Sequence, residues 1–152
     1  MNIELQKSLV SEWYMGFTHR DGDRFVATLA DNVVIRAVGN SPFSGTFEGK
    51  ATIQAAVAPL FAAFEPSENP ETDTEWKIMV ADGIRVVGMM AVNWKSAATG
   101  ADYPQRYCQV FEFNGDKISG IWEFFDTALI QTALAGNALR NPESPVEKPL
   151  LF

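Results

Sequence analysis

The chain has 152 residues, of which 47% are hydrophobic and 20% charged, and its formal net charge at pH 7 is −7. This balance excludes wholesale disorder, and the length predicts a single domain. Twelve basic residues against nineteen acidic ones provide no basic face for duplex nucleic acid or for an anionic membrane surface. A single cysteine and a single histidine exclude an internal disulfide and make the usual Cys- or His-rich metal sites unexpected.

The distribution of apolar residues predicts a cytoplasmic protein. The first residues show no basic segment followed by an apolar run, so no signal peptide is expected. No stretch approaches the roughly 18 apolar residues of a membrane span. The longest central apolar run, residues 86–92, has the length of a strand.

The first third of the chain predicts two helices and a strand. Over residues 3–18, apolar residues recur at spacings of three and four, which is the pattern of an amphipathic helix. Asp21 is placed to cap a second, short helix. The β-branched residues of 33–38 predict a strand.

A loop and a third helix are expected next. Residues 39–49 contain three glycines and one proline, which indicates a loop with at most a short strand. Residues 50–64 carry one apolar side and predict a helix, in which Pro59 is expected to cause a kink. Residues 65–74, rich in acidic residues and proline, predict a solvated connection.

The second half predicts an antiparallel meander. Alternating or continuous apolar patterns indicate strands over residues 75–81, 84–95, 103–113 and 117–125. Asp82-Gly83 and Asn114-Gly115-Asp116 are typical of hairpin turns. Asp126 is then expected to cap a last helix over 127–135.

This order of elements predicts an α+β fold, with helices packed on one face of a curved sheet. We expect one domain over residues 1–140 and a Pro-containing tail over 141–152. Several strands are apolar on both faces, although one face of an antiparallel sheet is normally allowed to be wet. The second face therefore predicts a homodimer, with cover by a crossing loop or by the tail as the alternative. The expected contact face carries Met90, Val92, Trp94, Cys108 and Val110.

Three segments resemble the nuclear-transport-factor-two-like superfamily, and its SnoaL-like branch in particular. They are the early helix pair, the segment 29–35 and the ending 115–129. The resemblance covers about residues 5–135, and limonene epoxide hydrolase and ketosteroid isomerase are relatives in this superfamily. It implies a cone-shaped α+β barrel with a deep apolar pocket between the concave sheet face and the helices. It also implies a homodimer through the outer sheet face. The reaction is not implied, because this fold hosts many chemistries.

The last hairpin predicts which side chains share a face. A three-residue turn pairs Tyr107 with Glu123 and Gln109 with Ile121. One face then carries Gln105, Tyr107, Gln109, Ile121, Glu123 and Phe125, and the other carries Arg106, Cys108, Val110, Trp122 and Phe124. A slip of one residue would reverse half of this assignment.

The resemblance supports the first of these faces as the concave one, but it transfers no known mechanism. It places Glu123 where limonene epoxide hydrolase has a catalytic aspartate, and Gln109 where ketosteroid isomerase has an oxyanion-binding aspartic acid. The other catalytic positions of the two enzymes correspond to residues without the required chemistry, namely Met89, Ala91, Ile35 and Ala37.

The predicted site is an apolar pocket with a polar cluster on one wall, which is the usual form of a small-molecule site. The expected catalytic residues are Glu123, Gln109 and Tyr107. The expected substrate-binding residues are Tyr14, Phe17, Ile35, Leu60, Phe64, Trp76, Met89, Ala91, Asn93, Gln105 and Phe125.

Glu123 decides between two functions. If Glu123 is a desolvated carboxylate, its raised pKa lets it move protons near neutral pH, and an enzyme without a cofactor is expected. Such an enzyme would isomerise, dehydrate, cyclise or open an epoxide on a cyclic polyketide-, terpene- or steroid-like substrate. As a buried residue that only satisfies its neighbours, or as a solvent-exposed one, Glu123 has no catalytic role. The absence of the partner carboxylates favours the second function, a non-catalytic ligand-binding or dimerisation module.

Overall fold

The structure is a computed structural model and describes residues 2–139. The helical elements are α1 (Ile3–Thr18), α2 (Gly22–Ala27), α3 (Lys50–Ala62), α4 (Pro70–Asp73), α5 (Thr127–Leu129) and the π-helical turn η1 (Ile130–Leu134). The strands are β1 (Leu29–Ala37), β2 (Gly45–Glu48), β3 (Thr74–Ala81), β4 (Arg85–Lys95), β5 (Asp102–Asn114) and β6 (Lys117–Phe125). The predicted tail, 141–152, lies outside the described residues.

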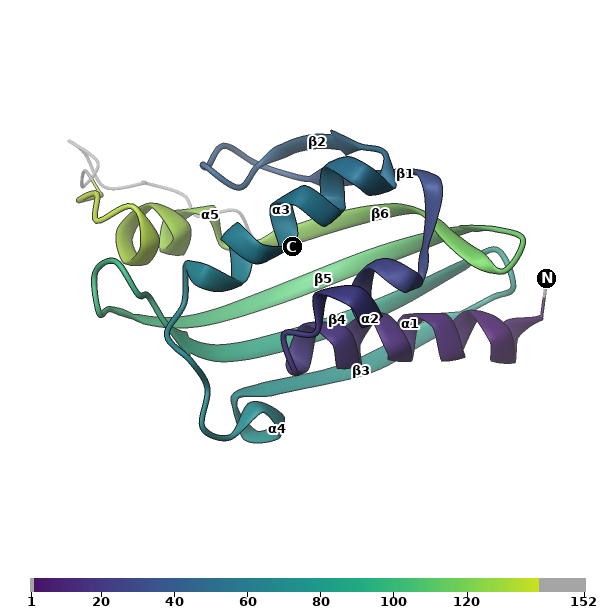
Figure 1. Ribbon diagram of the computed structural model, residues 1–152, viewed down its shortest axis with the longest axis horizontal. Coiled ribbons are helices and arrows are strands. Elements are labelled where there is room, and N and C mark those ends of the chain that lie inside the picture. The colour runs from purple at the N-terminus through teal and green to yellow at the C-terminus, as the bar shows by residue number, and fades with distance from the viewer. Residues whose placement is uncertain (1, 140–152) are drawn as a thin grey trace, which may run out of the picture.

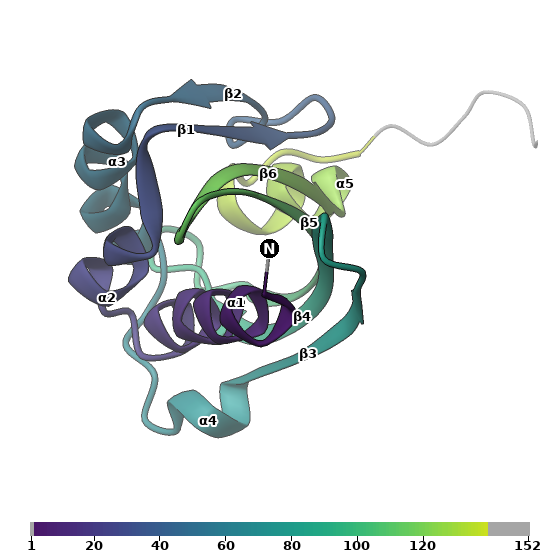
Figure 2. The same ribbon diagram turned by 90° about the vertical axis from the view of Figure 1, so that its right-hand side faces the viewer.

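The six strands form one curved sheet in the order β2-β1-β6-β5-β4-β3 (Figure 1). Viewed end-on, the sheet bends around α1, and α3 lies beside β1 and β2 (Figure 2). The expected α+β fold is confirmed. One detail differs: β1 pairs with β6 in parallel, so the sheet is mixed rather than wholly antiparallel. The parallel pair is possible because a long connection, not a hairpin, joins these strands.

Local chemistry accounts for the helix ends. The Asp21 carboxylate accepts a hydrogen bond from the backbone N–H of Arg24, as an N-cap does. The Asp126 carboxylate likewise accepts from the N–H groups of Ala128 and Leu129. The connection expected over 65–74 contains the short helix α4, which begins at Pro70, a favourable first helical residue. Helix α3 continues through Pro59.

The hairpin between β5 and β6 differs from the predicted register by two residues. The turn has two residues, Gly115-Asp116, and a bulge follows in β6. As a result Glu123 pairs with Gln109, and Phe125 pairs with Tyr107. The shorter turn and the bulge each shift the register by one residue, so their effects on side-chain parity cancel. The predicted pairs were wrong, but the predicted faces are confirmed.

Strand β4 faces the opposite way from the prediction. Met90, Val92 and Trp94 are buried in the core, whereas Met89 and Asn93 are exposed on the outer face. Both alternating series of this strand are apolar, so the pattern carried no signal for the inner face. The expected contact face was therefore wrong for its three β4 residues.

The core lies between α1 and the concave face of the sheet. Tyr14 stacks on Trp76 with ring centroids 5.1 Å apart, and Phe17 stacks on Trp94 at 5.5 Å. Gly88 on β4 makes this packing possible, because a Cβ atom there would overlap the Tyr14 hydroxyl and ring. No helix among residues 2–139 is long and apolar enough to cross a bilayer.

Candidate functional site

A cavity of about 440 Å³ lies between the concave sheet face and the helices α1, α2, α3 and η1. Its position and volume are typical of small-molecule sites. The described residues that line it are Trp13, Phe17, Phe25, Ile35, Ala37, Pro42, Phe43, Phe47, Ile53, Ala56, Val57, Pro59, Leu60, Phe64, Tyr103, Tyr107, Glu123, Phe125, Ile130 and Leu134.

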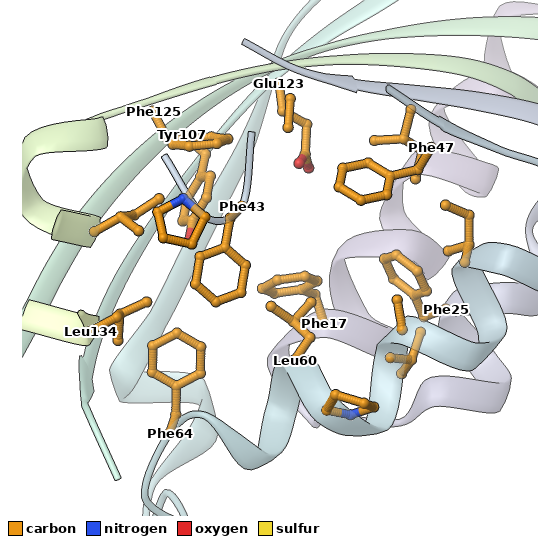
Figure 3. A pocket seen from close by; sticks show the side chains of 18 of the residues that line it. Phe17, Phe25, Phe43, Phe47, Leu60, Phe64, Tyr107, Glu123, Phe125 and Leu134 are labelled. Atoms are coloured by element: carbon orange, nitrogen blue, oxygen red, sulfur yellow. The ribbon is translucent and has the colours of Figure 1, made fainter. Parts of the chain in front are cut away.

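Glu123 is the one lining residue of that set with a carboxylate. It lies on β6 between Ala37 of β1 and Gln109 of β5. Figure 3 shows the carboxylate pointing into the cavity, so its accessible surface faces the cavity. Loss of hydration raises the pKa of Glu123 to about 7, although the neighbouring Gln109 amide partly offsets this effect. The carboxyl group can therefore both accept and donate a proton near neutral pH.

Gln109 lies beside Glu123 on β5 but does not line the cavity. Its side chain is fully buried, and its Oε1 accepts a hydrogen bond of 2.8 Å from the Tyr14 hydroxyl. Burial holds the pKa of Tyr14 far above its usual value, so the phenol stays a donor. Because Oε1 faces Tyr14, the Nε2 atom of the Gln109 amide points away from Tyr14. This Nε2 has no partner of good hydrogen-bond geometry. Tyr14 thus fixes the orientation of the amide beside Glu123.

Tyr107 brings a second polar group to the cavity. Its hydroxyl lies 3.1 Å from that of Tyr103, and its ring packs against Phe125. Burial raises the pKa of both phenols, so both are neutral at pH 7. A neutral phenol at the wall can donate a hydrogen bond to an oxygen of a bound molecule.

Gln105, expected to bind substrate, has a structural role. Its Nε2 donates to the Asp126 carbonyl at 2.8 Å, and its Oε1 accepts from the Asp126 N–H at 3.0 Å. The amide thus ties β5 to the start of α5 and does not line the cavity.

The structure brings together only some of the other predicted residues. Phe17, Ile35, Leu60, Phe64 and Phe125 line the cavity as expected. Tyr14 and Trp76 pack together outside it. The predictions for Met89, Ala91 and Asn93 were wrong, because these side chains belong to the outer face of β4.

The sequence interpretation missed two segments that line the cavity, the loop and strand around Phe43 and Phe47 and the turn η1. Phe43 and Phe47 come from a segment expected to be mostly loop, and η1 adds Ile130 and Leu134. Two aromatic residues four positions apart in a glycine-rich stretch were an available signal for a wall segment. Among residues 2–139, no group of three His, Cys, Asp or Glu side chains is arranged to hold a metal ion.

Comparison with known proteins agrees with this architecture. The sequence matches the SnoaL-like domain over residues 10–121. The chain belongs to the SnoaL-like family. This confirms the resemblance found in the sequence. The SnoaL-like chain matches no curated protein.

Solved structures share the SnoaL-like fold at low sequence identity. A Bacillus subtilis protein provisionally named an isomerase is 17% identical, with a TM-score of 0.76 over 92% of this chain and 100% of its own. TerC, crystallised with polyporic acid, is 17% identical, with a TM-score of 0.69 over 86% of this chain and 98% of TerC. A third structure is of a Catenulispora acidiphila protein with a ketosteroid isomerase-like fold, in complex with trimethylamine. It is 12% identical, with a TM-score of 0.66 over 84% of this chain and 92% of its own.

Proposed function

We propose that this SnoaL-like chain binds a small, largely apolar ring compound in the cavity and moves a proton on it with Glu123. One observation carries the proposal: a single carboxylate with a pKa of about 7 points into an otherwise apolar cavity. The proton leaves a carbon or hydroxyl of the substrate for the Glu123 carboxylate and returns to another atom, as isomerisation or dehydration requires. Tyr107 is placed to donate to a developing oxyanion. No cofactor is needed for such a step.

A cyclic polyketide-, terpene- or steroid-like skeleton suits this cavity. Phe17, Leu60, Phe64 and Phe125 offer apolar area, and burial of a ligand ring against such side chains contributes about 1–3 kcal/mol. The crystallised complexes of TerC and of the Catenulispora protein support a small-molecule role, because each of these proteins shares the fold.

A non-catalytic binding protein is the second candidate, and the position of Gln109 favours it. The residue that matches an oxyanion donor of ketosteroid isomerase lies behind the cavity wall. Among the residues expected to be catalytic, only Glu123 and Tyr107 therefore reach the cavity.

Binding of apolar ligands tests the cavity. We expect an apolar fluorescent probe to bind and hydrophobic ring compounds to displace it. Leu60→Asp puts a charge into the cavity wall and should weaken probe binding at least about tenfold. Gln54→Asp, which adds the same charge on the exposed side of α3, should leave it unchanged. If only phosphorylated or other highly charged metabolites raise the melting temperature, the proposal fails.

We also propose that the chain forms a homodimer through the outer sheet face. Two cross-strand rows of apolar side chains cover it, Met89-Cys108-Phe124 and Val87-Val110-Trp122. The exposed fractions of Met89, Trp122 and Phe124 are 46%, 38% and 45%. A monomer would leave this contiguous apolar surface in water, and a second copy would cover it.

Phe124→Lys should dissociate the dimer, because it places an unpaired charge in the interface at a cost of several kcal/mol, roughly 3–5. Sedimentation velocity at micromolar concentration should show a dimer for the wild type and a monomer for the variant. Ile84→Lys, on an exposed residue of the β3–β4 turn, should remain dimeric. A wild-type monomer would contradict the proposed dimer.

A further inference from the structure

The cavity contains one negative charge and no compensating positive charge. Glu123 is the only described lining residue with a formal charge, and it takes part in none of the ion pairs formed among residues 2–139. The titratable groups that face it are the phenols of Tyr14, Tyr103 and Tyr107, which burial keeps neutral. The described lining therefore provides no positive charge to pair with the ionised Glu123 carboxylate.

The cavity wall is also aromatic. Nine of the twenty described lining residues carry an aromatic ring: Trp13, Phe17, Phe25, Phe43, Phe47, Phe64, Tyr103, Tyr107 and Phe125. Figure 3 shows rings of the labelled Phe17, Phe43 and Phe47 around the space into which the Glu123 carboxylate points. Aromatic faces carry partial negative charge and attract cations, most strongly in a site that excludes water. A cation that lies over the face of one of these rings is attracted by the ring as well as by the carboxylate.

We propose that the preferred ligand of this cavity is a protonated amine on an apolar carbon skeleton, with its ammonium group at Glu123 and its skeleton against the rings. The inference rests on the proposed small-molecule site and names its ligand class. It does not depend on the proton-transfer step.

Binding of an ammonium group is favoured because Glu123 loses hydration during folding, before the ligand arrives. A buried ion pair is normally weak because both ions must lose their hydration. Here folding has already removed much of the hydration of Glu123, so binding adds the attraction and requires mainly the ligand to be dehydrated. A tertiary ammonium group, with one N–H, loses less hydration than a primary one. The net charge of −7 also favours the approach of a cation.

Neutral and anionic ligands of the same size fit less well. A neutral ring compound leaves the Glu123 carboxylate uncompensated above neutral pH. An anion is repelled by the carboxylate. Among ligands of similar size, charge rather than shape should therefore determine the affinity.

Three benzyl compounds of similar size test this charge preference: N,N-dimethylbenzylamine, benzyl methyl ether and phenylacetate. Calorimetric titration of the full chain at about pH 8 should show the amine binding at least about tenfold more tightly than the ether, and phenylacetate more weakly than both. From about pH 8 to pH 5.5, protonation of Glu123 should weaken amine binding about thirty-fold. Ether binding should not weaken over the same range, because the ether has no charge to pair.

Glu123→Gln should abolish the preference for the amine and keep binding of the ether. Glu48→Gln removes an exposed carboxylate of β2, beside a lining residue, and should retain the preference. If the Glu123 variant fails to fold, the pH dependence of the wild type alone decides. Equal affinity for amine and ether at pH 8 overturns the inference and leaves the proposed apolar site intact. Absence of binding by the amine, the ether and the apolar probe overturns the proposed small-molecule site as well.

Discussion

Glu123→Gln is expected to lower turnover by about 10²–10⁴, because glutamine keeps the shape of the side chain but cannot take up a proton. The rate is measurable before the natural substrate is known. Ring compounds that displace the apolar probe are incubated with the protein in D₂O, and mass spectrometry follows deuterium uptake at carbon. Tyr107→Phe, which keeps the ring and removes only a hydrogen-bond donor, should reduce the rate less than Glu123→Gln.

The same variant should be more stable than the wild type at alkaline pH. The folded-state pKa of Glu123, about 7, lies above its ordinary value of 4.5. The folded state therefore binds the proton more tightly than the unfolded state does, and stability is lost as pH rises from about 4.5 to 7. Above pH 7 the ionised carboxylate costs about 3 kcal/mol, which the neutral amide avoids. Urea unfolding at pH 8 should show this gain for Glu123→Gln, and at pH 4 the gain should disappear.

The exchange rate and the free energy of unfolding of Glu123→Gln together distinguish a catalytic role of Glu123 from a structural one. If Glu123 only satisfied its neighbours, the variant would keep its turnover and unfold more easily at pH 8, because Gln109 would lose a charged neighbour. A variant with wild-type exchange rates and a lower free energy of unfolding would contradict the catalytic role. The binding protein would then be the better description.

Gly88→Ala is expected to lower the free energy of unfolding by about 3 kcal/mol, because overpacking a rigid core forces side chains from their positions. The new Cβ atom would overlap the Tyr14 hydroxyl and ring, and Tyr14 is held between Trp76 and Gln109. Displacement of Tyr14 would also break its hydrogen bond to Gln109. Urea denaturation monitored by tryptophan fluorescence measures the loss.

Gly120→Ala is the matched control. This glycine is also buried in the sheet, but the nearest atom to a Cβ there is a carboxylate oxygen at the flexible end of Glu112. The Glu112 side chain can move aside, so the loss should be below about 1 kcal/mol. Equal losses for the two variants would contradict the close contact between Tyr14 and β4.

Periodicity predicted the elements well where one face is apolar and the other polar. The first helix follows from such a pattern, and capping by Asp21 and Asp126 follows from residue type. The faces of β5 and β6 were predicted from the hairpin instead, because side chains alternate along paired strands. The resemblance placed Glu123 on the concave face, and the structure agrees. Alternation also preserved the prediction for Glu123 when the register was wrong, because two shifts of one residue restore the face.

Where both faces of a strand are apolar, the sequence left the orientation open, and only the tertiary structure decided it. On β4, Gly88 provides the space for the Tyr14 ring, so Met90 lies inside with it and Met89 outside. Gln105 and Gln109 are the same residue type on the same face of β5. One bonds the backbone of Asp126 and the other bonds Tyr14, because each lies beside a different element. Hydrophobic periodicity and turn residues predicted most of the helices and strands, although not α4. Contacts between residues distant in the sequence decided which polar side chain meets the cavity.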